Sequence, residues 1–322
     1  MSKTTMSISA SGTKGGTVSL PDGSGLLGNM QKYWPYYVMV MPGVLFFIIF
    51  RYIPMLGTVI AFKDYSIFKG FGDSPWVGWK HFQALLNYPD FWRVFTNTLL
   101  LGLYRTLFLF PIPIVLALMM NEVRGKLLKK SIQTAVYIPY FLSWVIIAGL
   151  IFDIFGMGGL FNSIRALFGM EPILIMQDSS YFRTVYVISS IWKEAGWGTV
   201  IYLAAMSGID PALYESAMID GASRLKQIRY ITFPLLIPTI LILLLLNIGS
   251  FMDLGFEQVY NLLTPMTYNT GDIFDTFVYR VGIQQAQYSF TTAVGLFQST
   301  IGFILVFIFN KLANKFSDGG LW

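Results

Sequence analysis

Polar and acidic side chains recur at helical spacing within an otherwise apolar stretch near residues 235–261. Drawn as a helix with about 100° per residue, the stretch places Asn247, Ser250, Asp253 and Glu257 within about 120° of arc. Ionisable groups at membrane depth are costly, so they usually face a cavity or a partner. Such a stripe could line a polar translocation path, or it could form a hydrogen-bonded seam between two helices.

A second apolar stretch, near residues 183–207, carries two tryptophans beside two charges, namely Trp192, Lys193, Glu194 and Trp197. An indole can pack on the C–H face of a sugar ring while nearby polar groups take its hydroxyls. Adjacent Lys193 and Glu194 point about 100° apart on a helix, so they need not pair with each other. We therefore place Trp192, Lys193 and Trp197 on a sugar path; the alternative for the tryptophans is an interface anchor.

Other polar residues in apolar stretches are weaker candidates. Gln298 joins the predicted path, and Tyr137 and Tyr140 are further possibilities. Arg105 and Asp153 are expected to be internal structural charges.

Residues typical of catalytic and metal sites are scarce. The chain has no cysteine, which excludes disulfides and thiolate metal sites, and its only histidine is His81. No HExxH or GxSxG pattern is present, and no GxxxxGK[ST] phosphate loop. We expect no catalytic residue, no metal site and no cofactor on this chain.

The composition indicates a membrane protein. Of the 322 residues, 55% are hydrophobic and only 12% are charged, about half the charged fraction of a typical soluble domain. Six segments are long enough to cross about 30 Å of hydrocarbon as helices, and we place them near 36–61, 95–120, 133–156, 183–207, 235–261 and 287–313. Pro42, Arg51 and Pro54 predict a kink in the first. Residues 1–29 are rich in Ser, Thr and Gly and should form a flexible tail, followed by one membrane domain, residues 30–322.

The placement of Lys and Arg predicts the orientation. An even number of crossings puts both termini on one side, and the loops of that side hold the larger share of Lys and Arg. The positive-inside rule therefore predicts cytoplasmic N- and C-termini. The same rule puts the polar loop near residues 208–238 in the cytoplasm.

That loop has helix signals of its own. Asp210 followed by Pro211 is a favourable helix start, and Asp220-Gly221 marks a sharp turn. A second short segment begins at Ser223, with apolar residues at helical spacing among basic ones. The pattern predicts a helix-turn-helix outside the membrane, acting either as an amphipathic segment on the lipid surface or as a docking element.

A resemblance favours the docking element. Glu215-Ser216-Ala217, Asp220-Gly221-Ala222 and Ile231-Thr232-Phe233-Pro234 resemble the Glu-Ala-Ala loop of bacterial ABC importer permeases, with Ser216 in place of the second Ala. In that family the loop inserts into a cleft of the cytoplasmic ATPase and transmits its movement. The resemblance implies an ATPase-coupling set of Glu215, Ser216, Ala217, Asp220, Gly221, Ala222, Leu225 and Ile228.

The order of features along residues 35–322 resembles the carbohydrate-importing, maltose-permease-like branch. The ending VYNLLTPMTYNTGDIFDTFVYRVGIQQAQYSF is similar to permeases for complex oligosaccharides such as pectin-derived or alginate fragments. This resemblance implies an all-α type I ABC importer permease in the bacterial inner membrane. It also implies a second, homologous permease, two ATPase subunits that hold ATP and Mg, and an extracytoplasmic solute-binding protein that delivers the oligosaccharide.

Two other function classes fit less well. A secondary transporter would show inverted repeats with helices broken at matching positions, and no such halves are visible. A membrane enzyme would need the catalytic set that the chain lacks.

Overall fold

The computed structural model describes the backbone of residues 26–316 and the side chains of residues 33–311. Most of the expected tail 1–29 lies outside the described residues, although a helix already begins at Leu26. The chain divides into two compact units, with the boundary after Gly57. Between residues 26 and 316 there is no β-strand, only an isolated antiparallel bridge between Lys63 and Trp76.

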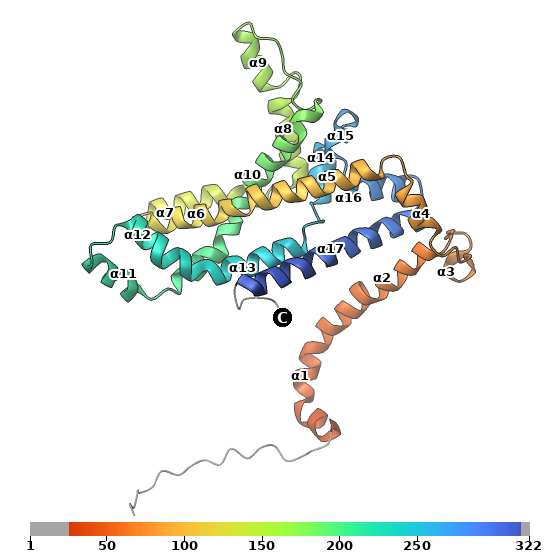
Figure 1. Cartoon of the computed structure of the whole chain (residues 1–322), viewed down its shortest axis with the longest axis horizontal. Helices are drawn as coiled ribbons and strands as arrows, with labels where there is room; N and C mark the ends of the chain where they lie inside the picture. The colour runs from red at the N-terminus through yellow and green to blue at the C-terminus, as the bar shows by residue number, and fades with distance from the viewer. Residues whose placement is uncertain (1–25, 317–322) are drawn as a thin grey trace, which may run out of the picture. The chain divides into compact units, whose positions relative to one another are not determined.

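The first unit is one curved helical run (Figure 1). Helix α1 (Leu26–Phe47) passes through a π-helical turn at Ile48–Tyr52 into α2 (Ile53–Leu56). Pro35 and Pro42 inside α1, together with Pro54 and the π-helical turn, account for the bend, because each disturbs the i→i−4 hydrogen-bond ladder. The predicted kink is confirmed.

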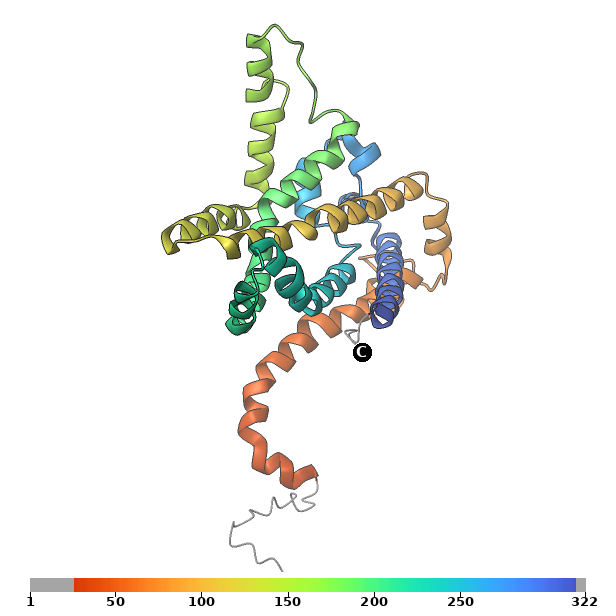
Figure 2. The same ribbon diagram turned by 60° about the vertical axis from the view of Figure 1, so that its left-hand side comes forward.

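The second unit is built from helices in the order α3 (Gly70–Asp73), α4 (Lys80–Leu86), α5 (Phe91–Tyr104), α6 (Pro111–Glu122), α7 (Lys126–Tyr137), α8 (Trp144–Phe155), α9 (Leu160–Leu167), α10 (Ser179–Ser207), α11 (Pro211–Ile219), α12 (Arg224–Gln227), α13 (Phe233–Gly249), α14 (Phe256–Leu262), α15 (Tyr268–Gly271), α16 (Phe274–Val278) and α17 (Tyr288–Phe316). Short 3-10 helices span Gly57–Phe62, Ile138–Phe141 and Pro265–Thr267, and π-helical turns span Arg105–Leu109, Ile228–Thr232 and Tyr279–Gln284. Helices α11 and α12 lie at one end of this unit, and α4 lies at the other (Figures 1 and 2).

Five helical runs in the described part of the chain are long and apolar enough to cross a membrane: Tyr33–Phe62, Phe91–Glu122, Trp144–Leu167, Arg224–Gly249 and Tyr288–Lys311. The predicted fourth segment is helix α10, whose 29 residues would extend about 44 Å at 1.5 Å per residue. It is long enough to cross, but it is less apolar than the other runs because it carries Arg183, Lys193 and Glu194.

Two predicted segments were wrong as continuous helices. The third, 133–156, is broken at Leu142 and Ser143, where α7 and its 3-10 extension end and α8 begins with Ser143 as its N-cap. The fifth, 235–261, ends at Gly249 and resumes at Phe256, after Gly255 adopts a φ of +80°. Apolar content alone cannot show such breaks, because the residues on both sides remain apolar.

Helix α10 lies at the centre of the packing. Its Tyr202 and Met206 form a buried cluster with Ile114 and Ala117 of α6 and Leu236 of α13. Towards its other end, Tyr186 and Phe182 pack with Leu254, Val259 and Leu262. A Cβ at Gly196 would collide with the carbonyl oxygen of Val136, so glycine allows α7 and α10 to approach closely. This packing holds the polar residues of α10 against the two helix breaks.

Candidate functional site

The predicted helix-turn-helix is present as α11, a turn and α12. The side chain of Asp210 caps α11 by accepting the N–H of Ala212 at 2.9 Å, and Pro211 occupies the first turn. Gly221 has a φ of +73°, which a residue with a Cβ rarely adopts. The glycine therefore permits the reversal between the two helices.

Two contacts tie the loop to the rest of the unit. The hydroxyl of Tyr214 on α11 lies 2.9 Å from that of Thr232, just before α13. The guanidinium of Arg224 on α12 lies 2.9 Å from the carboxylate of Glu122, at the end of α6. The loop is thus joined to two of the long helical runs.

The loop also exposes apolar side chains. Ile219 is 87% exposed and Leu225 76% exposed, and Met218 and Tyr230 are exposed as well. Of the predicted coupling residues, Glu215, Ser216, Asp220 and Gly221 are exposed, while Ala217, Ala222 and Ile228 are half-buried. Ile219 and Met218 were missed, although their position beside the turn at Gly221 could have indicated them.

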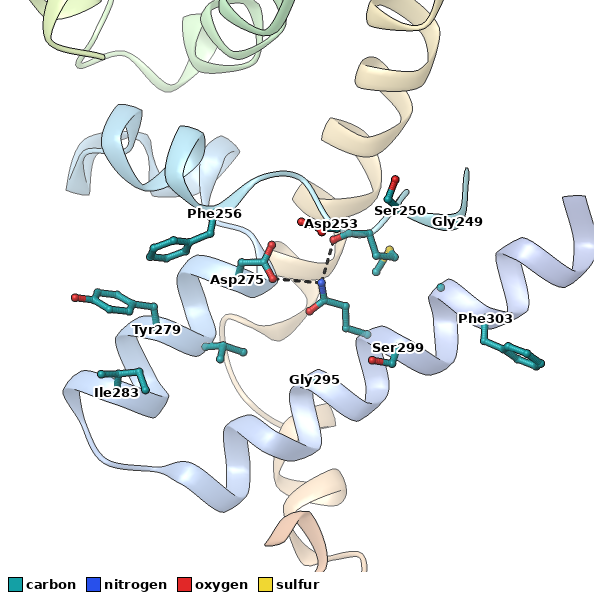
Figure 3. A pocket seen from close by; sticks show the side chains of 14 residues that line it. Gly249, Ser250, Asp253, Phe256, Asp275, Tyr279, Ile283, Gly295, Ser299 and Phe303 are labelled. Atoms are coloured by element: carbon teal, nitrogen blue, oxygen red, sulfur yellow. Dashed lines mark hydrogen bonds between the residues drawn. The ribbon is translucent and has the colours of Figure 1, made fainter. Parts of the chain in front are cut away.

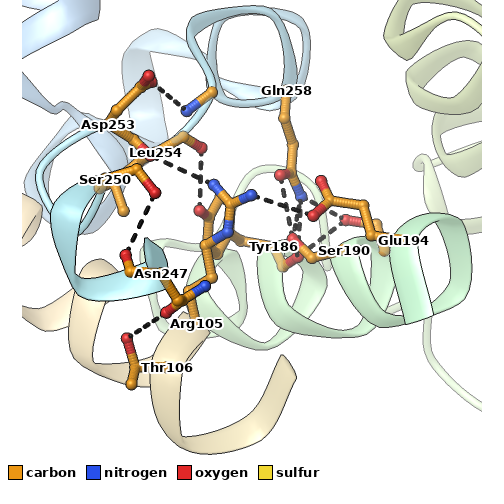
Figure 4. A network of polar contacts seen from close by, with 12 residues as sticks. Arg105, Thr106, Tyr186, Ser190, Glu194, Asn247, Ser250, Asp253, Leu254 and Gln258 are labelled. Carbon is orange, nitrogen blue, oxygen red and sulfur yellow. Dashed lines mark hydrogen bonds and ion pairs between the residues drawn. The ribbon is translucent and has the colours of Figure 1, made fainter. Parts of the chain in front are cut away.

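A polar network forms where α13 breaks (Figure 4). The break leaves consecutive backbone carbonyl groups without helical partners, and buried carbonyls must be paired. Those of Met252, Asp253 and Leu254 accept hydrogen bonds from Gln298, Arg105 and the Tyr186 hydroxyl at 3.0, 3.3 and 3.0 Å. Three different helical runs therefore hold the broken segment in place.

Arg105 also pairs with Glu194 of α10 at 3.0 Å. The expectation of an internal structural charge is confirmed for Arg105. It was wrong for Asp153, which is exposed near the end of α8.

Lys193 stabilises the other helix break, which lies between α7 and α8. Its ammonium group donates to the carbonyl oxygens of Tyr140 and Leu142, which the interruption before α8 leaves free, and it lies 5.2 Å from the ring centre of Trp144. Lys193 and Glu194 thus have separate partners, as their helical spacing predicted. Both line a cavity of about 570 Å³, together with Arg105, Tyr140 and Glu257.

A larger cavity, of about 700 Å³, lies between the broken segment and α17 (Figure 3). Asp253 and Ser250 line it from the break, Asp275 from α16, and Gln298 from α17. The Gln298 amide donates to Asp275 at 3.4 Å. Phe256 and Tyr279 add aromatic rings to a wall that carries two carboxylates and no cation.

The residues of the predicted path are only partly brought together. Because the helix breaks after Gly249, Asn247, Ser250, Asp253 and Glu257 do not form one helical stripe: Ser250 and Asp253 line the larger cavity and Glu257 the smaller one. Asn247 accepts a hydrogen bond from Thr106 at 3.3 Å, which is a contact between helices.

The two tryptophans also separate. Trp197 stacks on Tyr140 with 4.9 Å between ring centres, whereas Trp192 lines an apolar pocket between α8 and α10. Gln258 joins Ser189, Ser190 and Tyr186 in a buried network. The sequence does not indicate this role, because the apolar pattern continues from α13 into α14 without showing the break.

Comparison with known proteins identifies the family. Residues 110–318 match the family model described as "binding-protein-dependent transport system inner membrane component". The chain belongs to this family. The matched range includes both helix breaks and the α11–α12 loop of the permease.

Curated relatives cover most of the chain. The permease is 47% identical over 293 residues to the polygalacturonan/rhamnogalacturonan transport system permease protein YteP of Bacillus subtilis, covering 91% of each chain. It is 46% identical over 287 residues to Protein LplB of the same organism, covering 89% of this chain and 90% of that protein.

Two solved structures share the fold. A bacterial ABC transporter involved in the import of the acidic polysaccharide alginate matches with a TM-score of 0.83 and 40% identity, covering 90% of this chain and 98% of that one. A bacterial alginate ABC transporter in complex with alginate pentasaccharide-bound periplasmic protein matches with a TM-score of 0.84 and 39% identity, covering 92% and 99%. The predictions of a type I ABC importer permease fold and of membership in the sugar-importing permeases are confirmed.

Proposed function

We propose that this permease, paired with a second, homologous permease, forms the membrane path for an acidic oligosaccharide delivered by an extracytoplasmic binding protein. The similarity to permeases of polygalacturonan/rhamnogalacturonan and alginate transporters supports this substrate class. Those polymers carry a carboxylate on many of their sugar rings. The expected path residues that line the two cavities are Lys193, Ser250, Asp253, Glu257 and Gln298.

The observation that carries the proposal is the continuity between the exposed loop and the larger cavity. One helical run, Arg224–Gly249, begins within the loop and ends where Ser250 and Asp253 enter the cavity wall. A displacement of α11 and α12 would therefore reach the cavity through a rigid element. Without such a connection, ATP hydrolysis beneath the membrane could not change access to the path.

The partner of the loop is an ATPase subunit in this proposal. The apolar side chains of Ile219 and Leu225 would fill a cleft of that subunit, and Glu215 would meet a basic neighbour. Two such subunits would hold ATP and Mg, since this chain has no phosphate loop. The chain itself would perform no catalysis.

In this proposal the α11–α12 loop and both chain termini lie in the cytoplasm of a bacterium. The bias of Lys and Arg towards the loops on that side supports the orientation. The opposite end of the second unit, with α4, would face the binding protein.

Reconstitution of the complex tests the function. Proteoliposomes that contain both permeases and both ATPase subunits should hydrolyse ATP faster when binding protein loaded with trigalacturonate is present. The purified chain alone should hydrolyse none. Hydrolysis by the isolated chain, or no stimulation of the complex by loaded binding protein, would refute the proposal.

A further inference from the structure

A third polar cavity, of about 370 Å³, lies against α14 and the π-helical turn Tyr279–Gln284. It is distinct from the two cavities of the expected path, and none of its residues was predicted as a site. Water occupies about 30 Å³ per molecule in the liquid, so the cavity has room for about a dozen, which is more than enough for one sugar ring. Its lining includes Tyr260, Asn261, Tyr268, Tyr279, Arg280 and Gln284.

Arg280 is fixed in this cavity by a buried carboxylate. Asp272 is fully buried, and its two oxygens lie 3.1 and 2.6 Å from the two terminal nitrogens of Arg280. Thr276 donates to the same carboxylate at 2.9 Å, and the backbone carbonyl of Asp272 accepts from Asn97 of α5 at 3.2 Å. Burial would lower the pKa of Arg280, but the hydrogen bonds and charge of Asp272 raise it, so the guanidinium stays charged.

This ion pair leaves Arg280 able to bind something else. A guanidinium has five N–H donors in a fixed plane; Asp272 takes two of them, and the Tyr268 hydroxyl is a further hydrogen-bond partner. One face of the guanidinium lies 4.7 Å from the ring centre of Tyr268. Such an arrangement presents the remaining donors at a defined angle, which suits a planar carboxylate.

The rest of the lining suits a sugar. The rings of Tyr260 and Tyr279 lie 5.1 Å apart edge to face, and a hydrogen bond with Tyr279 raises the pKa of Tyr260, so the Tyr260 phenol stays neutral. The Gln284 side chain is exposed and makes no hydrogen bond to the described residues. Aromatic faces beside amide and phenol groups are what a ring with apolar C–H faces and polar edges requires.

The charge of this cavity differs from that of its neighbour. Tyr279 lines both this cavity and the 700 Å³ cavity, so the two adjoin. The larger one carries Asp253 and Asp275 without a cation, whereas the lining of this one carries Arg280 without a carboxylate. Of these two cavities, only the smaller one therefore offers a guanidinium with which a sugar carboxylate can pair.

We propose that the cavity lined by Tyr260, Tyr279, Arg280 and Gln284 is a subsite for one uronate ring of the incoming oligosaccharide. The ring packs against the tyrosines, its carboxylate accepts from the donors of Arg280 that Asp272 and Tyr268 leave available, and Gln284 forms a hydrogen bond with a hydroxyl. The subsite holds this ring while the neighbouring part of the oligosaccharide passes Tyr279. This inference rests on the proposed function and extends it to residues outside the expected path.

The test uses the full transporter in proteoliposomes with binding protein loaded with trigalacturonate. Gln284→Ala and Tyr260→Ala remove exposed groups and should each raise the KM for uptake about fivefold, the effect of one lost hydrogen bond or stacking contact, with kcat little changed. Arg280→Lys keeps the charge next to Asp272 but loses the planar donors, and it should raise KM at least as much. Gln285→Ala changes an exposed neighbour outside the cavity lining and should leave KM as in the wild type.

The outcomes separate the inference from the proposed function. If the wild-type complex does not respond to the loaded binding protein, the proposed function fails, and the inference fails with it. If the wild type responds but all three variants keep its KM, only the subsite is overturned. A higher KM for Gln284→Ala and Tyr260→Ala with an unchanged KM for Arg280→Lys would overturn the recognition of a carboxylate.

Discussion

The hydroxyl groups of Tyr214 and Thr232 lie 2.9 Å apart and join the exposed helix α11 to the turn that leads into α13. Thr232 is buried and Tyr214 half-buried, so this contact is shielded from most of the solvent. It provides α11 with a direct link to the run Arg224–Gly249, in addition to the backbone through Gly221. A force on α11 would reach α13 by both routes.

The first prediction concerns this link. Tyr214→Phe removes only the hydroxyl, and a lost hydrogen bond of this kind costs about 0.5–1.5 kcal/mol. We expect the complex to assemble with a slightly lower melting temperature and to hydrolyse more ATP for each oligosaccharide taken up. Tyr230→Phe, at an exposed position, is the matched control. An unchanged ratio of hydrolysis to uptake in Tyr214→Phe would argue against the link.

A second prediction concerns the turn. Gly221→Val should disturb it, because a β-branched residue is strained at a φ of +73°, whereas Gly221→Asn should be tolerated since Asn adopts this region more readily. We expect loss of ATPase association in a pull-down from membranes for Val and near-normal association for Asn. Gly208 has a negative φ, so Gly208→Ala should associate normally. Equal association of the Val and Asn variants would contradict the requirement for positive φ.

The third prediction concerns the pair Arg105–Glu194. Each side chain is about a quarter exposed, so a single change should destabilise the complex by about 2 kcal/mol, less than for a fully buried pair. Arg105→Gln should cost more than Glu194→Gln, because Arg105 also supports the carbonyl of Asp253. A double-mutant cycle on melting temperatures measures the coupling. Additive effects of the two single variants would show that the pair does not act as a unit.

A fourth prediction concerns access to the cavities. The chain has no cysteine, so single Cys replacements of Asp253, Glu257 and Gln298 can be probed with an aqueous thiol reagent. We expect reaction at these positions, at rates that change with nucleotide, because they line cavities. Leu246 is an exposed position on α13 that faces lipid in the proposed arrangement. A Cys at this position should therefore react little, because a thiolate hardly forms in hydrocarbon. Equal, nucleotide-independent rates at all positions would indicate a static helix packing instead of a path.

Sequence reasoning succeeded where the signals are local. Asp210-Pro211 and Asp220-Gly221 fix a helix start and a turn through cap chemistry and positive φ, and both are confirmed. The apolar runs predicted the membrane-spanning helices to within a few residues where the helix has no break, as for 95–120 and 287–313.

Sequence reasoning failed where tertiary contacts decide. The break after Gly249 is held by Gln298, Arg105 and Tyr186, which lie 46 to 148 positions away along the chain from the carbonyls that they bind. No helical wheel can include such partners, so the stripe through Asn247 and Glu257 was an artefact of assuming a straight helix. The cavity beside Arg280 was likewise invisible, since its lining comes from α14, α15 and the turn after α16.

The central claim is that this chain converts ATP hydrolysis on a partner into movement of an oligosaccharide, through α11 and α12. The most direct measurement compares ATP-driven uptake of trigalacturonate by proteoliposomes that contain the wild type or Ile219→Asp, which places a charge on the most exposed apolar residue of the loop. Uptake should fall more than tenfold in the variant, while insertion into the membrane and pairing with the second permease stay normal. Wild-type uptake by Ile219→Asp, with the ATPase still associated, would contradict the account.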